Sequence, residues 1–246
     1  MENERMKLPR RWLKFILKHF RDDFFLHYQD DTSRILMLAH ERGYAPMHII
    51  DVGAYEGKFT LSVLDIFPDT HVYMFEPQES KRKALERICS DHSNVTLNTV
   101  LLDETKREDV PFYLMESGSS ILFENTTHRR TLTHIDTDTL DSFFTSPAGD
   151  YLIKHDTQGY ELSVLNGGKE VLKHASMVII EASLVEYNIG APTPYDIMSF
   201  MHQNGFVLYE LGGMKRNATE KLLFQFDMFF CRNNNPLREI RDFSVT

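Results

Sequence analysis

The sequence predicts an α/β, Rossmann-like fold in which a mostly parallel sheet is covered by helices on both faces. Short apolar runs of strand length alternate with longer stretches of helical periodicity, from residue 48 to residue 232. The strand-like runs are apolar on both faces, which is typical of parallel strands buried between two layers of helices. With 42% hydrophobic and 12% aromatic residues, the chain of 246 residues can bury a core of this size.

The elements are expected in a regular order after residue 48. Strands are expected over 48–53, 71–77, 95–102, 150–156, 177–183, 206–211 and 224–232. Helices are expected between them, over 59–67, 80–90, 161–174 and 194–206. A polar, serine-rich interval separates the third strand from the fourth.

Two further helices are expected before the sheet. The first has basic residues on one side and, on the other, apolar residues at helical spacing within 8–26: Leu13, Ile16, Leu17, Phe20 and Phe24. The second is expected over Thr32–Arg42 and ends at Gly43. We expect the first helix to pack on the domain or on a second subunit. A membrane-surface or lid helix is the alternative.

The chain therefore divides into three parts. Residues 1–47 are expected to form an N-terminal helical extension that serves as a lid or as an oligomer contact, and a homodimer through these helices is one expected arrangement. Residues 48–232 form the α/β domain, and residues 233–246 form a C-terminal tail.

Charge excludes some classes of partner. The formal net charge is −9, and it is uneven, because residues 1–21 contain seven basic and two acidic side chains. The acidic remainder repels phosphate backbones, so no nucleic-acid partner is expected. No apolar run reaches the length of a transmembrane segment, and no signal-peptide pattern stands at the N-terminus. A cytoplasmic protein is therefore expected.

A glycine-containing turn follows the first expected strand. It reads Asp51-x-Gly53-x-x-x-Gly57, and the second strand ends in Glu76. Ligands of such sheets bind beyond the carboxyl ends of the strands, where glycines permit close backbone approach and a carboxylate can bind ribose hydroxyls. The pattern differs from the dinucleotide motif, because Tyr55 and Lys58 replace the later glycines.

S-adenosylmethionine fits this looser turn better than a pyrophosphate does, since Asp51 can receive its ammonium group and Glu76 its ribose. Asp103, after the third strand, can reach the adenine amino group or serve as an ordinary loop acid. The predicted cofactor-binding residues are Asp51, Gly53, Ala54, Tyr55, Gly57, Thr60, Glu76, Pro77, Asp103 and Asp156.

The sequence from about Ile35 to Arg232 resembles the FkbM family of S-adenosylmethionine-dependent methyltransferases. The resemblance rests on IIDVGAYEGKFT, FEP, VIIEAS, NGFVLYEL and above all K-x-D-x-Q-G-x-E-L-x-V-L-x-G, held here by Lys154, Asp156, Gln158, Gly159, Glu161, Leu162, Val164, Leu165 and Gly167. It implies a class I methyltransferase fold over 48–232, with a seven-stranded sheet whose last strand is antiparallel. It also implies O-methylation of natural-product or sugar hydroxyls. Tyr55 and His155 depart from the family, which often has Asn and an aliphatic residue at these positions.

Four residues around the motif are the catalytic candidates. Asp156, at the end of the fourth strand, is expected to act as general base, to orient the acceptor or to contact the cofactor; alternatively it caps the following turn. Lys154 lies on the same strand face and can pair with it. His155 faces the opposite side, where a core histidine is favoured over a catalytic one. Glu161 opens the next helix, as a dipole partner or an acceptor-side residue.

Other polar and aromatic residues are weaker candidates for the same edge. No metal is expected; Asp156, Glu161 and Glu181 are the only carboxylates considered for one, and their spacing is not a diagnostic ligand set. Ser119 and Ser120 are expected to line the adenosyl or acceptor pocket. Tyr187 and Tyr195 either form a wall for the acceptor or pack within their loop.

These features lead to one main hypothesis and two alternatives. The main hypothesis is an S-adenosylmethionine-dependent O-methyltransferase that acts on a small molecule, a sugar or a glycan. The first alternative is a nicotinamide-dependent oxidoreductase, which the missing glycines disfavour. The second is a non-catalytic module that binds the cofactor without turnover.

Overall fold

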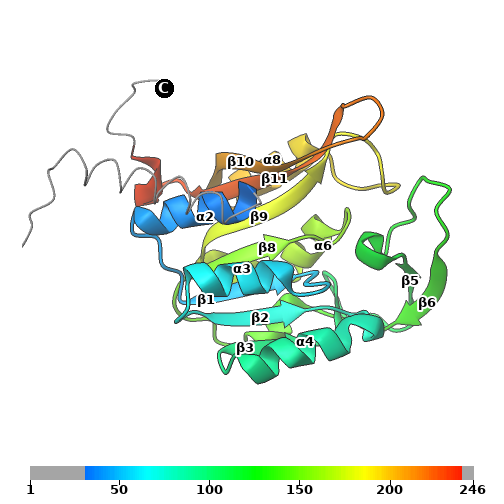
Figure 1. Cartoon of the computed structure of the whole chain (residues 1–246), viewed down its shortest axis with the longest axis horizontal. Coiled ribbons are helices and arrows are strands. Elements are labelled where there is room, and N and C mark those ends of the chain that lie inside the picture. The colour runs from blue at the N-terminus through cyan, green and yellow to red at the C-terminus, as the bar shows by residue number, and fades with distance from the viewer. Residues whose placement is uncertain (1–30, 240–246) are drawn as a thin grey trace, which may run out of the picture.

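The computed structural model describes residues 31–239, which fold around a seven-stranded sheet (Figure 1). Its strands are β1 (His48–Val52), β2 (His71–Phe75), β3 (Val95–Asn98), β8 (Tyr151–His155), β9 (Ala175–Ser183), β10 (Phe206–Arg216) and β11 (Leu223–Arg232). The strand order is β10-β11-β9-β8-β1-β2-β3. All pairs from β9 to β3 are parallel, whereas β11 is antiparallel to both of its neighbours. The predicted fold class is confirmed, including the antiparallel last strand.

Helices cover both faces of this sheet (Figure 1). One face carries α2 (Asp31–Glu41), α3 (Lys58–Ile66) and α4 (Glu79–Asp91). The other carries α5 (Leu140–Phe143), α6 (Glu161–Asn166), α7 (Lys169–His174) and α8 (Pro194–Gln203). The core lies in two layers because successive strand residues point to opposite faces.

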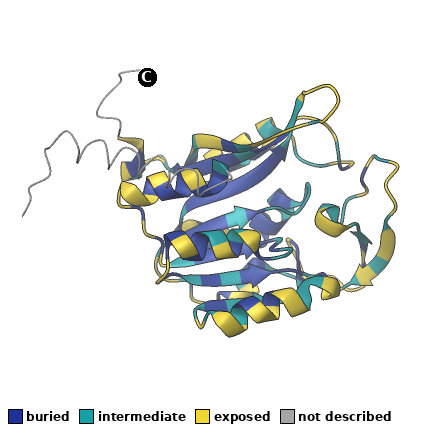
Figure 2. Cartoon of the chain, in the orientation of Figure 1, coloured by how far each residue is buried: buried dark blue, intermediate teal, exposed yellow. Residues whose placement is uncertain are grey.

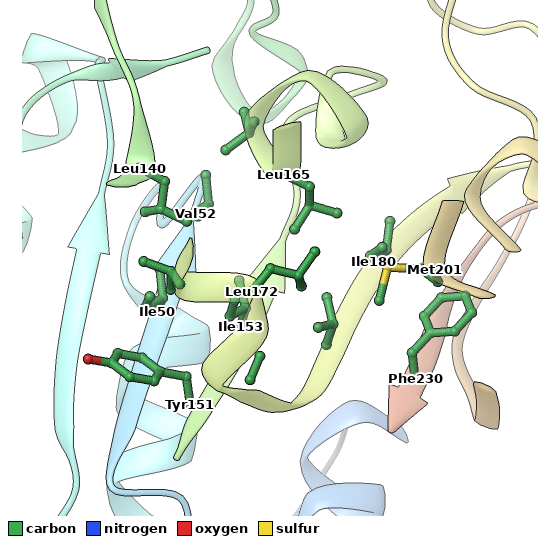
Figure 3. Packing of buried hydrophobic residues seen from close by; sticks show 14 of the residues in the cluster. Ile50, Val52, Leu140, Tyr151, Ile153, Leu165, Leu172, Ile180, Met201 and Phe230 are labelled. Atoms are coloured by element: carbon green, nitrogen blue, oxygen red, sulfur yellow. The ribbon is translucent and has the colours of Figure 1, made fainter. Parts of the chain in front are cut away.

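Adjacent residues of one strand separate into the two layers. On β1, Ile49 packs with the α2–α4 layer and Ile50 with the α5–α8 layer. Figure 3 shows Ile50 and Ile153 in the second layer, with Leu172 packed close to them. The strands are mostly buried while the helices keep an exposed outer face (Figure 2). This continuous burial explains why the strands read as apolar on both faces.

The helix α2 belongs to this core. Ile35, Leu36 and Met37 are buried in the same cluster as Ile49 and Phe229. The described part of the predicted N-terminal extension, residues 31–47, therefore packs on the sheet; the helix expected over 8–26 lies outside the described residues. None of the helices within residues 31–239 combines the length and apolar character needed to cross a bilayer.

The helix predicted over 161–174 is wrong in one respect, since the chain forms two short helices there. α6 and α7 are separated at Gly167 and Gly168. A Cβ atom added to Gly167 would lie 2.1 Å from the carbonyl oxygen of Asp103. This close approach of two backbones requires glycine at 167, and the chain leaves helical geometry at Gly168, which has a φ of −123° and a ψ of 32°.

The strand predicted over 95–102 also differs. It leaves the sheet after Asn98, and its last two residues, β4 (Leu101–Leu102), pair with β7 (Thr137–Asp138). They do so because Leu102 is buried in the core cluster that contains Leu140. The serine-rich interval contains structure that was not predicted: the antiparallel pair β5 (Val110–Leu114) and β6 (Thr131–Ile135).

Candidate active site

Two hollows lie side by side at the carboxyl edge of the sheet. The inner cavity encloses about 700 Å³ of space, part of it open to solvent, and is lined by the ends of β1 and β2, by β4 and by residues 117–121. The outer cleft encloses about 960 Å³ and is lined by residues 115–118, by His128 and Arg129, and by side chains of the β10–β11 hairpin. Asp156 lines both. It therefore stands where contents of the two would meet.

The turn after β1 is held tightly against its neighbours. Gly53 has a φ of 78°, and a Cβ atom there would lie 2.1 Å from the carbonyl oxygen of Asp156. Only glycine tolerates both conditions. The amide N–H groups of Gly53 and Ala54 donate to the carbonyl of Phe75 at 3.0 and 3.2 Å. The predicted glycine turn thus brings β1, β2 and β8 together at the rim of the inner cavity.

Glu76 is a buried carboxylate on the wall of the inner cavity. Its Oε2 accepts from the Tyr55 amide at 2.8 Å, and its Oε1 accepts from the Gln78 amide at 2.9 Å. Burial raises the pKa of Glu76, although these N–H groups counteract the shift. Each oxygen keeps a further lone pair for a ligand hydroxyl. Tyr55 and Pro77 line the same wall.

Asp51 lies beneath the turn and is not on the cavity wall. It is fully buried; its Oδ2 accepts from the Thr60 hydroxyl at 2.8 Å, and its Oδ1 is 3.9 Å from the Lys154 ammonium. Burial raises its pKa. Asp51 and Thr60 support the turn from below, and the direct contact of Asp51 with a ligand ammonium stays a prediction. Ala54 and Gly57 likewise shape the turn without lining the cavity.

Asp103 is held by two neighbouring side chains behind the inner cavity. It is fully buried and forms an ion pair with Arg107. The Tyr160 hydroxyl donates to its Oδ1 at 2.9 Å. Its side chain does not line the inner cavity, whereas the preceding Leu101 and Leu102 do. Of the two interpretations of Asp103, the ordinary structural acid is therefore the one that this geometry favours.

The remaining walls of the inner cavity are apolar and suit a flat ring. Phe75, Leu102, Phe112 and Ile121 line it, together with the serine-rich segment. Ser119 and Ser120 are on this wall, as predicted. A hollow with apolar walls and a few fixed polar groups is typical of small-molecule sites.

Asp156 is the centre of a polar network. The Lys154 ammonium is 3.3 Å from its Oδ2, so the predicted ion pair is confirmed. The Gln158 amide donates to Asp156 Oδ1 at 2.7 Å and to Glu181 Oε2 at 2.9 Å, and Lys215 forms an ion pair with Glu181. The Asp156 carboxylate thus accepts hydrogen bonds from side chains. It does not cap the following turn by accepting from backbone N–H groups of that turn.

The network controls the charge of its members. Burial by itself would raise the pKa of Asp156, but the ammonium groups of Lys154 and Lys215 and the Gln158 amide outweigh it and hold the pKa below its usual range. Burial would lower the pKa of Lys154, but the carboxylates of Asp156 and Asp51 raise it instead. For Glu181, burial and the nearby Asp156 raise the pKa to about 7. Asp156 is therefore the stably ionised carboxylate of the site.

His155 and Glu161 line neither the inner cavity nor the outer cleft. His155 is fully buried, neither ring nitrogen has a partner among the described residues, and burial lowers its pKa to about 3. It is the core histidine that strand alternation favoured. The buried Glu161 carboxylate accepts from the amides of Thr157 and Gly159 at 3.2 and 2.9 Å. It holds the turn after β8. The core position of His155 and the helix-start position of Glu161 agree with the interpretations that the sequence favours, and their catalytic alternatives stay predictions.

The outer cleft contains residues that the sequence did not single out. Lys215 and Gln225 come from the β10–β11 hairpin and both contact Glu181. No local signal marks them; Gln158 alone could have been found, since it belongs to the K-x-D-x-Q-G motif. Tyr187 lines the cleft, whereas Tyr195 lies on α8 with 77% of its surface exposed. Within residues 31–239, no group of three or more acidic, histidine or cysteine side chains could hold a metal.

Comparison with known proteins gives a family match. The model of the methyltransferase FkbM domain matches residues 51–208. No curated protein matches the chain. Among solved structures, methyltransferase FkbM from Methylobacillus flagellatus KT is similar, with 16% identity and a TM-score of 0.47 over 74% of this chain and 43% of that one. The chain thus spans less than half the length of that protein.

Two further solved structures are similar over most of their length. Magnesium protoporphyrin IX methyltransferase from Synechocystis PCC 6803 has 11% identity and a TM-score of 0.45 over 82% of this chain and 78% of that one. Precorrin-6y C5,15-methyltransferase from Geobacter metallireducens GS-15 has 10% identity and a TM-score of 0.45, over 81% and 87%.

Proposed function

The chain belongs to the FkbM family of methyltransferases, and from this premise we propose that it transfers a methyl group from S-adenosylmethionine to a hydroxyl of a small molecule, sugar or glycan. One observation carries the proposal: an ionised carboxylate, Asp156, lines both the inner cavity and the outer cleft. A cofactor in the first and an acceptor in the second would meet at this side chain.

The residues of the inner cavity fit the cofactor. Glu76 would hold the ribose hydroxyls through its remaining lone pairs, and Phe75, Leu102 and Phe112 would pack on the adenine ring. The turn at Gly53 lets the backbone approach the amino-acid tail. The buried carboxylates at this edge favour a cation. When bound, the cofactor supplies a methyl group on a positively charged sulfur. An oxygen nucleophile can attack the methyl carbon and displace the sulfur.

Asp156 would orient and deprotonate the acceptor. Its carboxylate accepts a hydrogen bond from the acceptor hydroxyl and directs an oxygen lone pair toward the inner cavity. The hydroxyl proton becomes strongly acidic as the new carbon–oxygen bond forms, so Asp156 can accept it despite its lowered pKa. Lys154 and Gln158 keep the carboxylate in place. An amine acceptor fits less well, because its ammonium form would pair with Asp156 and offer no lone pair.

Calorimetric titration of the full chain with S-adenosylmethionine and S-adenosylhomocysteine tests the cofactor assignment. We expect micromolar binding of S-adenosylmethionine, and we expect Glu76→Ala to weaken it more than about tenfold, which corresponds to about 1.4 kcal/mol. Glu79→Ala is the matched control, because it removes the same charge from an exposed position on α4. Its affinity should remain that of the unmodified chain.

Other outcomes of this titration point to the alternatives. Absence of S-adenosylmethionine binding overturns the proposal, and a thermal shift with NAD in its place would support a nicotinamide-dependent enzyme. Binding without transfer of labelled methyl to any member of a panel of hydroxylated acceptors would favour a non-catalytic module.

A further inference from the structure

An apolar trough lies next to the outer cleft. It encloses about 1070 Å³, much of it open to solvent, between the segment that follows β9 and the tip of the β10–β11 hairpin. Figure 1 shows both segments on the same side of the molecule. Its apolar lining consists of Leu184, Val185, Tyr187, Leu222, Leu223 and Phe224.

Several large apolar side chains of the trough are exposed to solvent. Leu184, Val185 and Leu222 are 53%, 51% and 62% exposed. Single exposed leucines are common on protein surfaces, but several of them gathered in one hollow mark a binding site. Asn217 and Glu220 are the polar members of the lining.

Backbone hydrogen bonds hold the walls of the trough in place. The Leu184 amide donates to the carbonyl of Phe224 at 2.8 Å, which fixes the first wall to β11. In the hairpin tip, the Asn217 amide donates to the carbonyl of Leu222 at 2.9 Å, and the Asn217 side chain accepts from the Glu220 amide at 2.9 Å. The apolar side chains are therefore presented by an ordered backbone.

The trough is continuous with the candidate active site. Tyr187 and Phe224 line both the trough and the outer cleft, and Asp156 lines both the cleft and the inner cavity. A single molecule with a hydroxyl at Asp156 can thus extend past Tyr187 and Phe224 into the trough. A surface that served only to join two copies of the chain would not need this continuity.

We propose that the trough binds an apolar portion of the methyl acceptor, an alkyl, acyl or aryl group attached to the part that carries the reacting hydroxyl. The inference rests on the proposed function, and it narrows the acceptor to amphipathic hydroxy compounds. The polar part lies in the outer cleft among Lys215, Gln158 and Arg129. The apolar part lies on Leu184, Val185 and Leu222.

A series of alkyl glucosides tests this assignment. Methyl, hexyl and octyl glucoside, kept below their micelle concentrations, are titrated into the full chain by calorimetry, alone and with S-adenosylhomocysteine. Affinity should rise with chain length, by up to about fourfold per methylene group. Leu222→Asp should abolish this rise. Leu132→Asp is the matched control, because Leu132 is 52% exposed on β6, away from the trough, and it should leave the rise unchanged.

Each result supports or overturns the assignment. Equal affinities along the series, or equal losses in the two variants, overturn it while S-adenosylhomocysteine binding still supports the proposed function. If glucoside affinity rises with chain length but S-adenosylhomocysteine does not bind, the trough binds apolar groups but not those of a methyl acceptor, and the assignment is overturned. A sedimenting dimer that Leu222→Asp dissociates shows that a second copy occupies the trough and also overturns the assignment. Unchanged melting temperatures of both variants establish that they fold.

Discussion

The inner cavity and the outer cleft are built in different ways. The inner cavity is formed where strands end, and its parts are joined by backbone hydrogen bonds: the Gly53 amide to the carbonyl of Phe75, and the Asp156 amide to the carbonyl of Val52, each at 3.0 Å. The outer cleft is formed by connections that project past the sheet, after β5 and in the β10–β11 hairpin (Figure 1). Its contacts are mostly between side chains, such as Lys215 with Glu181.

This difference in construction suits the two proposed ligands, the cofactor in the inner cavity and the acceptor in the outer cleft. A site built on strand ends is held rigidly, and a rigid site suits a cofactor whose structure does not vary with the acceptor. Loops and hairpins change length and sequence without disturbing the sheet, so they suit the part of a site that selects its acceptor. Asp156 belongs to both regions, and variants around it can test whether the two act independently.

The largest expected effect is on catalysis, from Asp156→Asn. We expect methyl transfer to slow about 10²–10⁴-fold, because asparagine keeps the size of the side chain but cannot accept the hydroxyl proton. Affinity for S-adenosylhomocysteine should be nearly unchanged. Initial rates with labelled S-adenosylmethionine and the best glucoside acceptor measure the first quantity, and calorimetry measures the second. Unchanged turnover would show that Asp156 does not accept the proton. It would also contradict the proposal that cofactor and acceptor meet at Asp156, between the inner cavity and the outer cleft.

The sequence predicts residues of the inner cavity better than residues of the outer cleft. Gly53, Glu76 and Asp156 could be found because each lies within a few residues of a recognisable strand, and strand ends of a parallel sheet meet at one edge. Lys215 and the apolar trough could not, since their approach to Asp156 depends on how a hairpin packs against a distant loop. For Asp103 the sequence leaves two roles open, a contact with the adenine amino group and an ordinary loop acid, and the packing of Arg107 and Tyr160 around its carboxylate favours the second.

The break between α6 and α7 shows the limit of local patterns in the fold itself. The apolar spacing of 161–174 continues across Gly167, so a single helix was expected. Asp103 lies behind Gly167 and leaves no room for a Cβ there, and the helical geometry ends at Gly168. Sequence periodicity predicts which face of a segment is buried, but it does not report a close approach from another part of the chain.

The next expected effect is on stability, from Gly53→Ala. The added Cβ would meet the Asp156 carbonyl oxygen at 2.1 Å in a backbone with a φ of 78°. We expect the free energy of unfolding to fall by about 2–4 kcal/mol in chemical denaturation. Gly43→Ala is the matched control, because Gly43 has a φ of 92° but no atom of the described residues 31–239 would lie within 4 Å of its added Cβ; the free energy of unfolding should fall by about 1 kcal/mol. Equal losses would show that β1 and β8 are not held together at this point.

The smallest expected effect is on the pH dependence of stability, from Glu181→Gln behind the outer cleft. The pKa of Glu181 is raised from 4.5 to about 7, mainly by burial and by Asp156, while Lys215 counteracts the shift. Between these pH values the folded chain keeps a proton that the unfolded chain has released, so the free energy of unfolding falls as the pH rises. The slope is at most about 1.4 kcal/mol per pH unit for one group.

Glutamine at position 181 cannot titrate, so the variant should lack this fall. Denaturant unfolding at pH 5, 6 and 7 should show the unmodified chain losing stability relative to Glu181→Gln at each step. Glu86→Gln, at an exposed position on α4, is the control and should track the unmodified chain. If the two curves for Glu181→Gln and the unmodified chain remained parallel, Glu181 would already be ionised at pH 5. Lys215 would then hold a permanent ion pair, and the outer cleft would be electrostatically as fixed as the inner cavity.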